Sequence, residues 1–309
     1  MGVAFVFDGQ GAQWPGMGKA LSEASNAAKD VFDMADSIRP GTSAQCFEGG
    51  REELADTANT QPCLYTVNLA AAMALKERGV TPACLAGFSL GELSALAFAG
   101  GMSPEEGLRL TITRGRLMAD EAGRHPGAMA AVIGLTAAEV EALCKETEGF
   151  APANYNAPTQ TVVSGLKDAL PAFKEAAVLR GGRVMPLNVS GAFHSVYMRG
   201  AADGFLRELE KAELRKPAIP VYANLTAAPY GEAIKDTLAG QISGPVRWVE
   251  TIKRMQREGI DTFVAMGAGN TLCGLIKKIY PEAVCHAVSD AGSLEAAVSA
   301  LSGHKETST

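Results

Sequence analysis

A serine between two glycines, in the run Gly87-Phe88-Ser89-Leu90-Gly91, is the strongest chemical signal in the sequence. An apolar run ends at Phe88 and the helix-forming run LGELSALAFAG follows, so the serine stands at a predicted strand-to-helix turn. Flanking glycines permit the strained turn that lifts a nucleophilic hydroxyl clear of a sheet. The N–H of Leu90 would then stand at a helix N-terminus, where free backbone donors stabilise an oxyanion. Because a chain with 34 glycines also produces this pattern by chance, an ordinary structural turn is the alternative.

A serine hydroxyl is a weak nucleophile unless a base lies beside it, and histidine is the usual base. Of the four histidines, His125 precedes a proline in a predicted surface turn, His286 lies in a strand-like run, and His304 belongs to the polar C-terminal run. His194 follows a predicted strand in the loop SGAFHS and is therefore the candidate base, with a structural histidine as the alternative. No acid with a recognisable motif lies between Ser89 and His194, so a backbone carbonyl could hold the imidazole tautomer instead.

Arg114 lies off the polar face of its predicted helix. At about 100° per residue, Arg114 points to the apolar side. A buried guanidinium needs an anionic partner. Glu121, two turns further on, would give an internal ion pair, whereas a substrate carboxylate would give a binding site. The helical angles leave both open. The charged residues that share the polar face are Glu105, Glu106, Arg109, Arg116 and Asp120.

The loop at 8–13, DGQGAQ, follows the first predicted strand and invites a nucleotide-binding interpretation. It fails the dinucleotide fingerprint because Trp14 stands where G-x-G-x-x-G needs a glycine, and the sequence has no G-x-x-x-x-G-K-[ST] motif. The N–H of Gln10, flanked by glycines, could instead complete an oxyanion hole with the N–H of Leu90. An ordinary tight turn is the alternative.

Composition excludes several classes of function. The chain has 309 residues, 47% of them hydrophobic and 20% charged, which suits one or two globular domains with a sizeable core. Its formal net charge of -6 supplies no positive field for a nucleic acid. The longest apolar runs fall short of the roughly 20 residues that a membrane span needs. Six scattered cysteines without zinc-ligand spacing indicate reduced thiols in a cytoplasmic protein with no metal site.

Alternating strands and helices must position these residues. Strand-like and helix-like runs alternate along the chain, which predicts an α/β fold with a parallel or mixed sheet covered by helices. The predicted strands are 3–7, 84–88, 127–135, 161–166, 184–189 and 262–267. One helix is predicted from about Thr60 to before Gly79, and another from Ser103, whose spacing to Glu106 is that of a capping box.

Between 127 and 192 the order of elements changes. The pattern there is strand, helix (136–147), one or two strands, helix (167–180), strand. This order predicts a compact α+β unit of split βαβ type, inserted in the larger α/β domain.

Taken together, these segments resemble the malonyl-CoA:acyl carrier protein transacylases of fatty acid synthesis and the related polyketide synthase acyltransferase domains. The resemblance covers nearly the whole chain, and the order and spacing of its motifs make it specific. The motifs are FDGQGAQWPGMG at 7–18, GFSLGE at 87–92, TRGRLM at 113–118, GAMAAVIGL at 127–135, NYNAPTQTVVSG at 154–165, SGAFHS at 190–195, GQISGPVRW at 240–248 and MGAGNTLCGLIKK at 266–278. The resemblance implies an α/β-hydrolase-like core, formed by 1–126 and 193–309, with a ferredoxin-like insert at 127–192.

The resemblance also implies a role for each candidate residue. Ser89 would be the acylated nucleophile and His194 its general base and acid. Arg114 would hold the free carboxylate of a malonyl group. The backbone N–H groups of Gln10 and Leu90 would bind the oxyanion.

A sixth residue enters only through the resemblance: Gln241 would orient His194 through its main-chain carbonyl, which explains the missing acid. Phe193, before the histidine, accompanies malonyl rather than methylmalonyl choice in the synthase relatives. The sequence departs from the family at four positions, of which Phe88 matters most because it neighbours the nucleophile and bears on the acyl preference. The departures are Phe88 for histidine, Asp8 for proline, Ala12 for serine and Ala268 for proline.

The implied function is the transfer of a malonyl group from malonyl-CoA to the phosphopantetheine thiol of an acyl carrier protein, without a cofactor. The expected location is cytoplasmic; the sequence does not reveal the oligomeric state, and a monomer is favoured. The alternatives are transfer of another acyl group in a specialised synthase, hydrolysis of an acyl thioester, and a non-catalytic scaffold that docks the carrier. Because carrier proteins are usually acidic, basic clusters are candidate docks. These are Lys253, Arg254 and Arg257, or Lys277 and Lys278.

Overall fold

The computed structural model describes residues 2–189 and 191–302 and contains two β-sheets. The larger sheet has the strand order β10-β9-β1-β2-β7-β8. Its strands are parallel except β8, which pairs with β7 antiparallel. The strands are β1 (Gly2–Phe7), β2 (Cys84–Gly87), β7 (Val221–Ala223), β8 (Ala228–Pro229), β9 (Ile260–Met266) and β10 (Val284–Val288). Ser190, His304 and the rest of the polar run at 303–309 lie outside the described residues.

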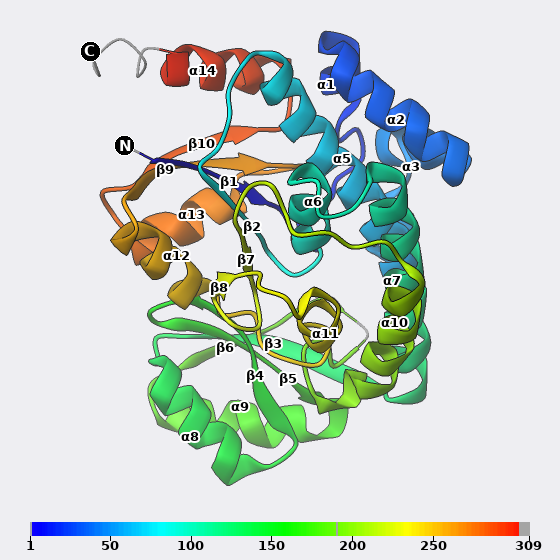
Figure 1. Ribbon diagram of the computed structural model, residues 1–309. Helices are drawn as coiled ribbons and strands as arrows, with labels where there is room; N and C mark the ends of the chain where they lie inside the picture. The colour runs from blue at the N-terminus through cyan, green and yellow to red at the C-terminus, as the bar shows by residue number, and fades with distance from the viewer. Residues whose placement is uncertain (1, 190, 303–309) are drawn as a thin grey trace.

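Helices cover both faces of this sheet (Figure 1). Those packed on its strands are α5 (Thr57–Glu77), α6 (Gly91–Phe98), α12 (Trp248–Arg257), α13 (Thr271–Ile279) and α14 (Ala291–Ser302). The other helices of this part of the chain are α1 (Lys19–Ala24), α2 (Asn26–Ile38), α3 (Thr42–Glu48), α4 (Arg51–Ala55), α7 (Pro104–Arg124), α10 (Arg199–Lys211) and α11 (Ile234–Gly240). Successive side chains of a strand point to opposite faces. Phe5 and Phe7 of β1 therefore lie in one core with α5 and α6, whereas Ala4 and Val6 lie in another with α12 and α13.

Local sequence sets the starts of the two helices predicted from the chain. α5 begins three residues before its predicted start, because the Asp56 side chain caps it by accepting the N–H of Ala58. α7 begins after Ser103 as predicted, and the Ser103 hydroxyl accepts the N–H of Glu106, one of the two bonds of a capping box. The two helices pack against each other, and the caps set the residue at which each helix begins.

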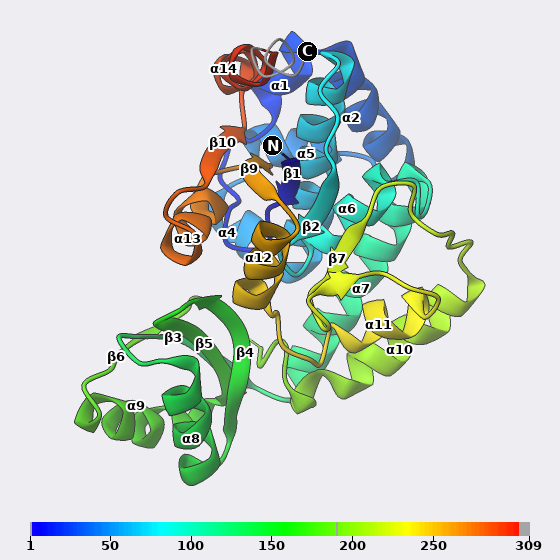
Figure 2. The same cartoon turned by 60° about the vertical axis from the view of Figure 1, so that its left-hand side comes forward.

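The second sheet is antiparallel, with the order β4-β5-β3-β6. Its strands are β3 (Gly127–Ile133), β4 (Phe150–Ala157), β5 (Gln160–Leu166) and β6 (Arg183–Pro186), and its helices are α8 (Ala137–Thr147) and α9 (Leu170–Leu179). Side chains of both helices pack into one core with the sheet. The element order β-α-β-β-α-β and this strand order are those of a ferredoxin-like unit. The predicted fold class, an α/β core with an inserted ferredoxin-like unit, is confirmed, and Figure 2 shows the insert below the large sheet.

The chain crosses between the two sheets at adjacent points. An isolated antiparallel bridge joins Pro126 to Gly191, and β3 begins at the residue after the first of these. The last strand of the insert is shorter than predicted and ends at Pro186. The division into 1–126 with 193–309 and an insert at 127–192 stays a prediction.

Parts of the large sheet lie outside the predicted strands. β7 has three residues and β8 two, which is too short for an alternating pattern to be visible. β10 coincides with the strand-like run around His286, and most of its residues are only partly buried. Across 2–189 and 191–302, the helices are too short or too polar for any of them to cross a membrane.

Candidate active site

Ser89 lies at the turn between β2 and α6, at the carboxyl end of the central parallel strands. Its backbone φ is 51°, an uncommon value for a residue with a Cβ. The flanking glycines stand where no Cβ fits. One built on Gly87 would collide with the backbone of Gly91, and one built on Gly91 would collide with the backbone of Phe7. The glycines therefore let the turn pass against β1 while the serine side chain points outward from the sheet edge.

Asn224 holds this strained turn from the loop after β7. Its Oδ1 accepts the N–H of Ser89 at 2.6 Å, and its Nδ2 donates to the carbonyl of Gly87 at 2.5 Å. Two hydrogen bonds to buried backbone groups thus offset the cost of the positive φ. No motif marks Asn224 in the sequence, because it lies 135 residues from Ser89 and meets the turn only through strand pairing.

His194 contacts the serine hydroxyl, with Ser89 Oγ and His194 Nε2 2.7 Å apart. Its Nδ1 lies 2.8 Å from the carbonyl of Gln241 and 3.1 Å from that of Gly244. Both partners are acceptors, so Nδ1 carries the proton and Nε2 is free to accept the proton of Ser89. Burial and the nearby Arg114 lower the pKa of His194 to about 4, so the imidazole is neutral at physiological pH.

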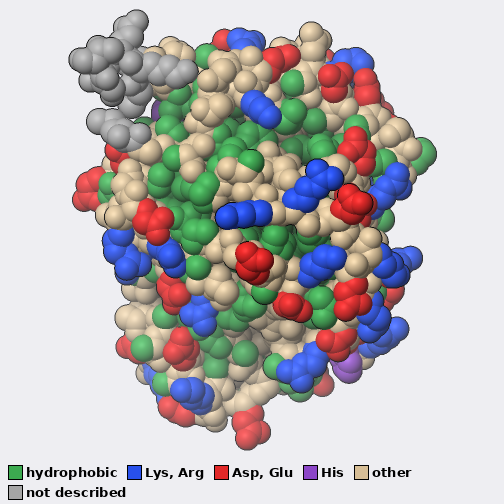
Figure 3. All heavy atoms as spheres, viewed as in Figure 1, with side chains coloured by type: hydrophobic (Ala, Val, Ile, Leu, Met, Phe, Trp, Pro, Cys, Tyr) green, Lys and Arg blue, Asp and Glu red, His purple; other side chains and the backbone are tan. Residues whose placement is uncertain are grey.

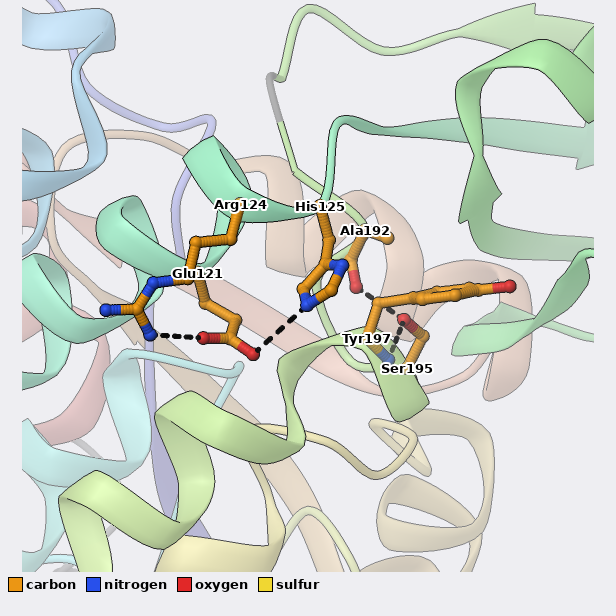
Figure 4. A network of polar contacts seen from close by, with 6 residues as sticks. All are labelled: Glu121, Arg124, His125, Ala192, Ser195 and Tyr197. Carbon is orange, nitrogen blue, oxygen red and sulfur yellow. Dashed lines mark hydrogen bonds and ion pairs between the residues drawn. The ribbon is translucent and has the colours of Figure 1, made fainter.

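A tight turn presents this histidine. His194 has φ 58°, and its N–H donates to the carbonyl of Ile242 at 3.2 Å. The neighbouring Ser195 hydroxyl donates to the carbonyl of Ala192 at 2.6 Å and accepts the N–H of Tyr197 at 3.3 Å (Figure 4). Hydrogen bonds of His194 and Ser195 therefore fix the backbone of this loop.

Arg114, fully buried on α7, points at the nucleophile. Its Nη1 donates to Gln61 Oε1 at 2.7 Å, and its Nη2 donates to Gln241 Oε1 at 2.8 Å and to Ser89 Oγ at 3.3 Å. Burial lowers its pKa to about 10, and the charge of Glu92 opposes this shift. The guanidinium is thus charged and bonded to neutral amides.

The ion pair with Glu121 that the sequence left open is wrong. Glu121 lies 3.3 Å from Arg124 and 3.8 Å from His125, at the end of the same helix (Figure 4). Arg114 and Glu121 share a buried side, but seven residues of helix separate them by about 10 Å along the axis. Glu121 instead pairs with Arg124 and His125 at the end of α7. Arg114 is bonded to Gln61 of α5 and to Gln241 at the end of α11.

Glu92, one turn after Ser89, is a candidate positioning residue that the sequence did not reveal. This fully buried carboxylate accepts hydrogen bonds from the Tyr230 hydroxyl, the Asn224 N–H at 3.0 Å and Gln241 Nε2 at 3.1 Å. Burial raises its pKa to about 7, against the hydrogen bonds that favour the carboxylate. A single acid inside the apolar run LGELSALAFAG was the available signal. Glu92 joins the groups that position both Ser89 and His194.

A cavity of about 480 Å³ lies between the two sheets and contains most of the predicted site. Ser89, His194, Arg114, Gln10 and Leu90 line it from the large domain. The insert contributes an opposite wall, whose residues include Met129, Ala131, Asn154, Asn156, Gln160 and Val162. Gln241 does not line the cavity; it lies on the side of the large domain and bridges Arg114 to the carbonyl of Ser89, to which its Nε2 donates at 2.7 Å.

Gln10 and Leu90 lie on neighbouring turns at the ends of β1 and β2, which are paired in parallel. The turns pack backbone to backbone, since a Cβ built on Gly9 would lie 2.5 Å from the carbonyl of Phe88. The Gln10 side chain is tied by its Nε2 to Thr57 Oγ1 at 3.1 Å. The structure brings the two residues to the same wall as Ser89; their binding of an oxyanion stays a prediction.

Phe88, the neighbour of the nucleophile, also lines the cavity. Its ring packs edge-on against Trp248, with the ring centroids 5.4 Å apart. The position therefore contributes an apolar surface instead of a hydrogen-bonding group. Among the described residues, no cluster of three or more His, Cys, Asp or Glu side chains is placed to hold a metal ion.

This arrangement supports nucleophilic attack on an acyl group that carries a negative charge. A neutral imidazole can take the proton of the serine, and the two turns that carry Gln10 and Leu90 line the same cavity. A buried guanidinium beside the serine attracts an anion, which it would bind through two parallel N–H bonds.

The sequence matches the family described as acyl transferase domain over residues 4–298. It is 39% identical over 310 residues to a malonyl CoA-acyl carrier protein transacylase of Bacillus subtilis strain 168, covering 97% of each chain. The structure superposes on that of a malonyl CoA-acyl carrier protein transacylase from Clostridium perfringens with a TM-score of 0.95 at 34% identity, covering 99% and 98% of the two chains. A second solved structure is a malonyl-transacylase in complex with the acyl-carrier protein of a type II PKS, with a TM-score of 0.94, 34% identity and coverage of 97% and 100%.

Proposed function

This chain belongs to the acyl transferase family, among the malonyl-CoA:acyl carrier protein transacylases, and from that premise we propose that it transfers malonyl from malonyl-CoA to a carrier protein through a malonyl-Ser89 ester. One observation carries the assignment of residues. A charged, buried guanidinium lies 3.3 Å from a serine hydroxyl that also contacts a neutral imidazole. An enzyme that hydrolyses neutral esters would not need this guanidinium, because its substrate carries no carboxylate to bind.

In the first half-reaction Ser89 Oγ attacks the thioester carbon while His194 Nε2 takes its proton. The N–H groups of Gln10 and Leu90 stabilise the oxyanion, and each lost donor costs on the order of 10²–10³ in rate. The C–S bond then breaks, and the protonated imidazole gives its proton to the CoA sulfur. In the second half-reaction the pantetheine thiol of the carrier attacks the ester by the same route, and Ser89 recovers its proton.

Arg114 selects the acyl group by binding the malonyl carboxylate. In the free protein its two terminal nitrogens already donate to Gln61 and Gln241, so substrate exchanges a neutral amide acceptor for a charged one. Hydrogen bonds from the guanidinium to a carboxylate are about twice as strong as those between neutral groups, so the exchange favours a malonyl substrate. An acetyl group has no carboxylate and cannot make it.

No other group is needed for these steps, because each proton and charge has a partner among the residues of this chain. We therefore propose that the enzyme works without a cofactor or metal. We also propose a cytoplasmic monomer without a nucleic-acid partner, since a net charge of -6 gives no positive field to hold one. The free state of all six cysteines supports a reducing compartment. Gel filtration at several protein concentrations tests the monomer.

The carrier is proposed to dock at the cavity mouth beside α13 rather than on α12. Thr271, Leu272 and Leu275 of α13 line the cavity, and Lys278 of the same helix donates to Gln160 Oε1 on the opposite rim at 3.0 Å. Arg254 of α12 is paired with Glu258. Figure 3 shows hydrophobic side chains on one face of the molecule, with Lys and Arg as well as Asp and Glu side chains among them. Lys278→Glu should raise the KM for carrier at least fivefold with kcat for CoA loading unchanged; Lys253→Glu is the matched control.

Intact-mass spectrometry after brief incubation with malonyl-CoA tests the function directly. Wild type should gain one malonyl group and lose it on addition of carrier protein, while Ser89→Ala should gain none. Free malonate released without carrier as fast as transfer proceeds with it would identify a hydrolase instead. Competition among CoA esters tests the other alternative, a different acyl unit, which the apolar Phe88 beside the serine makes worth measuring.

A further inference from the structure

Asp8 is a buried carboxylate that the reaction described above does not use. It follows β1, is 1% exposed and lies two residues before Gln10. Its Oδ2 accepts the N–H of Gly269 at 3.0 Å, and the N–H of Ala268 also bonds to this carboxylate. The side chain therefore reaches from the Gln10 loop to the loop that joins β9 to α13.

A second bond fastens the same two loops. The indole N–H of Trp14 donates to the carbonyl of Ala268 at 2.6 Å. Asn68 of α5 also holds Asp8, because its Nδ2 donates to the main-chain carbonyl of Asp8 at 2.8 Å. The site is closely packed, because a Cβ built on Gly267 would lie 2.7 Å from Asp8 Oδ2. We call the contacts of Asp8 and Trp14 with residues 268–269 the clasp.

The clasp lies between two walls of the cavity. On one side the loop continues to Gln10, which lines the cavity together with Ser89. On the other side α13 begins at Thr271, which lines the cavity with Leu272. A change in the clasp would therefore move the Gln10 loop and the start of α13, which line two sides of the cavity, at the same time.

Asp8 is also titratable in the working range. Burial raises its pKa to about 7, although the N–H groups of Gly269 and Ala268 favour the carboxylate. The titratable group that faces it is the thiol of Cys273 on α13, whose pKa the charge of Asp8 helps to raise. The neighbouring side chains on α5 and α6, Asn68 and Ser94, are neutral.

We propose that Asp8 is a positioning residue of malonyl transfer: its carboxylate fastens the Gln10 loop to the start of α13 and so holds the Gln10 N–H where the oxyanion forms. The proposal rests on the function proposed above. Because an ionised carboxylate is the stronger acceptor for the two N–H groups, protonation of Asp8 loosens the clasp and slows the acylation of Ser89. A misplacement of about 1 Å at a catalytic group is enough to cost on the order of 10²-fold in rate.

Kinetics of Ser89 malonylation test the role. Asp8→Asn and Asp8→Ala should lower kcat/KM by about 10- to 100-fold, less than the loss of an oxyanion donor. Wild type should show an acid limb near pH 7, which both variants lack and Glu92→Gln keeps. Asp290→Asn is the matched control, because Asp290 also follows a strand of the large sheet, β10, and accepts backbone N–H groups, those of the first turn of α14, but does not line the cavity. Wild-type kcat/KM and an unchanged acid limb in Asp8→Ala would overturn the proposal.

The partner of the carboxylate gives an independent test. Ala268→Pro removes one of the two N–H donors, because proline has none. If this N–H acts through Asp8, Ala268→Pro should lower the kcat/KM of Ser89 malonylation severalfold in wild type. In the Asp8→Ala background the same substitution should lower kcat/KM no further. Losses that add fully in the double variant would contradict the clasp.

Fluorescence separates a failure of the clasp from a failure of the function. The chain has two tryptophans, so in a Trp248→Phe protein the emission reports Trp14 alone. Its emission should titrate with a midpoint near pH 7, and Asp8→Asn should abolish the transition. This readout needs no substrate. A Trp14 signal that is flat from pH 5 to 9 would refute the clasp even in an active enzyme, whereas a titrating signal in a protein that loads no malonyl would refute only the function.

Discussion

Replacing Arg114 with alanine should change which acyl group the enzyme accepts rather than abolish its chemistry. The malonyl carboxylate can take two charge-assisted hydrogen bonds from the guanidinium, each contributing about 1.5–3 kcal/mol. The exchange is not free, because Nη1 and Nη2 must give up a neutral partner such as Gln61 Oε1, now at 2.7 Å. The net loss in Arg114→Ala is therefore expected at about 3–4 kcal/mol, a 10²–10³-fold fall in kcat/KM for malonyl-CoA.

Acetyl-CoA provides the internal control. It uses the same serine and histidine but has no carboxylate, so its loading in Arg114→Ala should change by less than about fivefold. This comparison also covers an indirect effect, because Arg114 contacts the side chain of Gln241, whose carbonyl orients His194. If the substitution acted by disturbing the histidine, both substrates would slow together.

The assay is single-turnover loading of each CoA ester, followed by intact-mass spectrometry, on wild type, Arg114→Ala and Arg114→Lys. Lysine keeps the charge but not the planar fork, so it should recover part of the malonyl rate. An equal fall for malonyl and acetyl would refute the reasoning, as would unchanged malonyl loading in the alanine variant.

Three further predictions concern the support of the site. Gly87→Ala should lower the free energy of unfolding by about 3 kcal/mol or more and abolish Ser89 malonylation, because its Cβ would collide with the backbone of Gly91; urea unfolding and mass spectrometry measure both, and near-wild-type stability would contradict the packing. Asn224→Ala leaves the Ser89 N–H and the Gly87 carbonyl unpaired, so we expect it to cost about 2–4 kcal/mol in urea unfolding and to slow loading, with no change in stability as the contrary result. Burial raises the folded-state pKa of Glu92 to about 7, so the protonated side chain contributes stability below the pKa of the unfolded chain, and this contribution is lost as the pH rises through 7. Glu92→Gln should therefore gain stability relative to wild type between pH 5 and 8. A difference in melting temperature that stays constant over this range would contradict the prediction.

The proposed nucleophile and base could be located from the sequence because both lie in short local patterns, and the structure places Ser89 Oγ 2.7 Å from His194 Nε2. Ser89 lies between glycines at a strand-to-helix turn, and elimination left His194 as the base. The partners of Arg114 could not be predicted in the same way. Helical angles show only that its side chain is buried, while Gln61 and Gln241 reach it from other helices. Two residues in one helix share a direction without being close enough to touch, which is why the ion pair with Glu121 failed.

The fold was more accessible than the support of the site. Alternating apolar runs located the central strands and the βαββαβ order of the insert, since these elements are long enough to show a period. β7 is too short to show one, and it leads to Asn224, so the residue that holds the nucleophile turn could not be predicted either. The clasp of Asp8 depends on contacts across 261 residues of chain, a separation that no local pattern encodes.

The paired crossings at Pro126 and Gly191 bear on how this architecture can diversify. One uninterrupted stretch of chain supplies the wall opposite the nucleophile, and its two ends already meet. Ser89, His194, Arg114 and Gln241 all come from outside that stretch. We therefore expect that exchanging this stretch at its two adjoining ends would change the shape of the wall while leaving Ser89, His194, Arg114 and Gln241 in place.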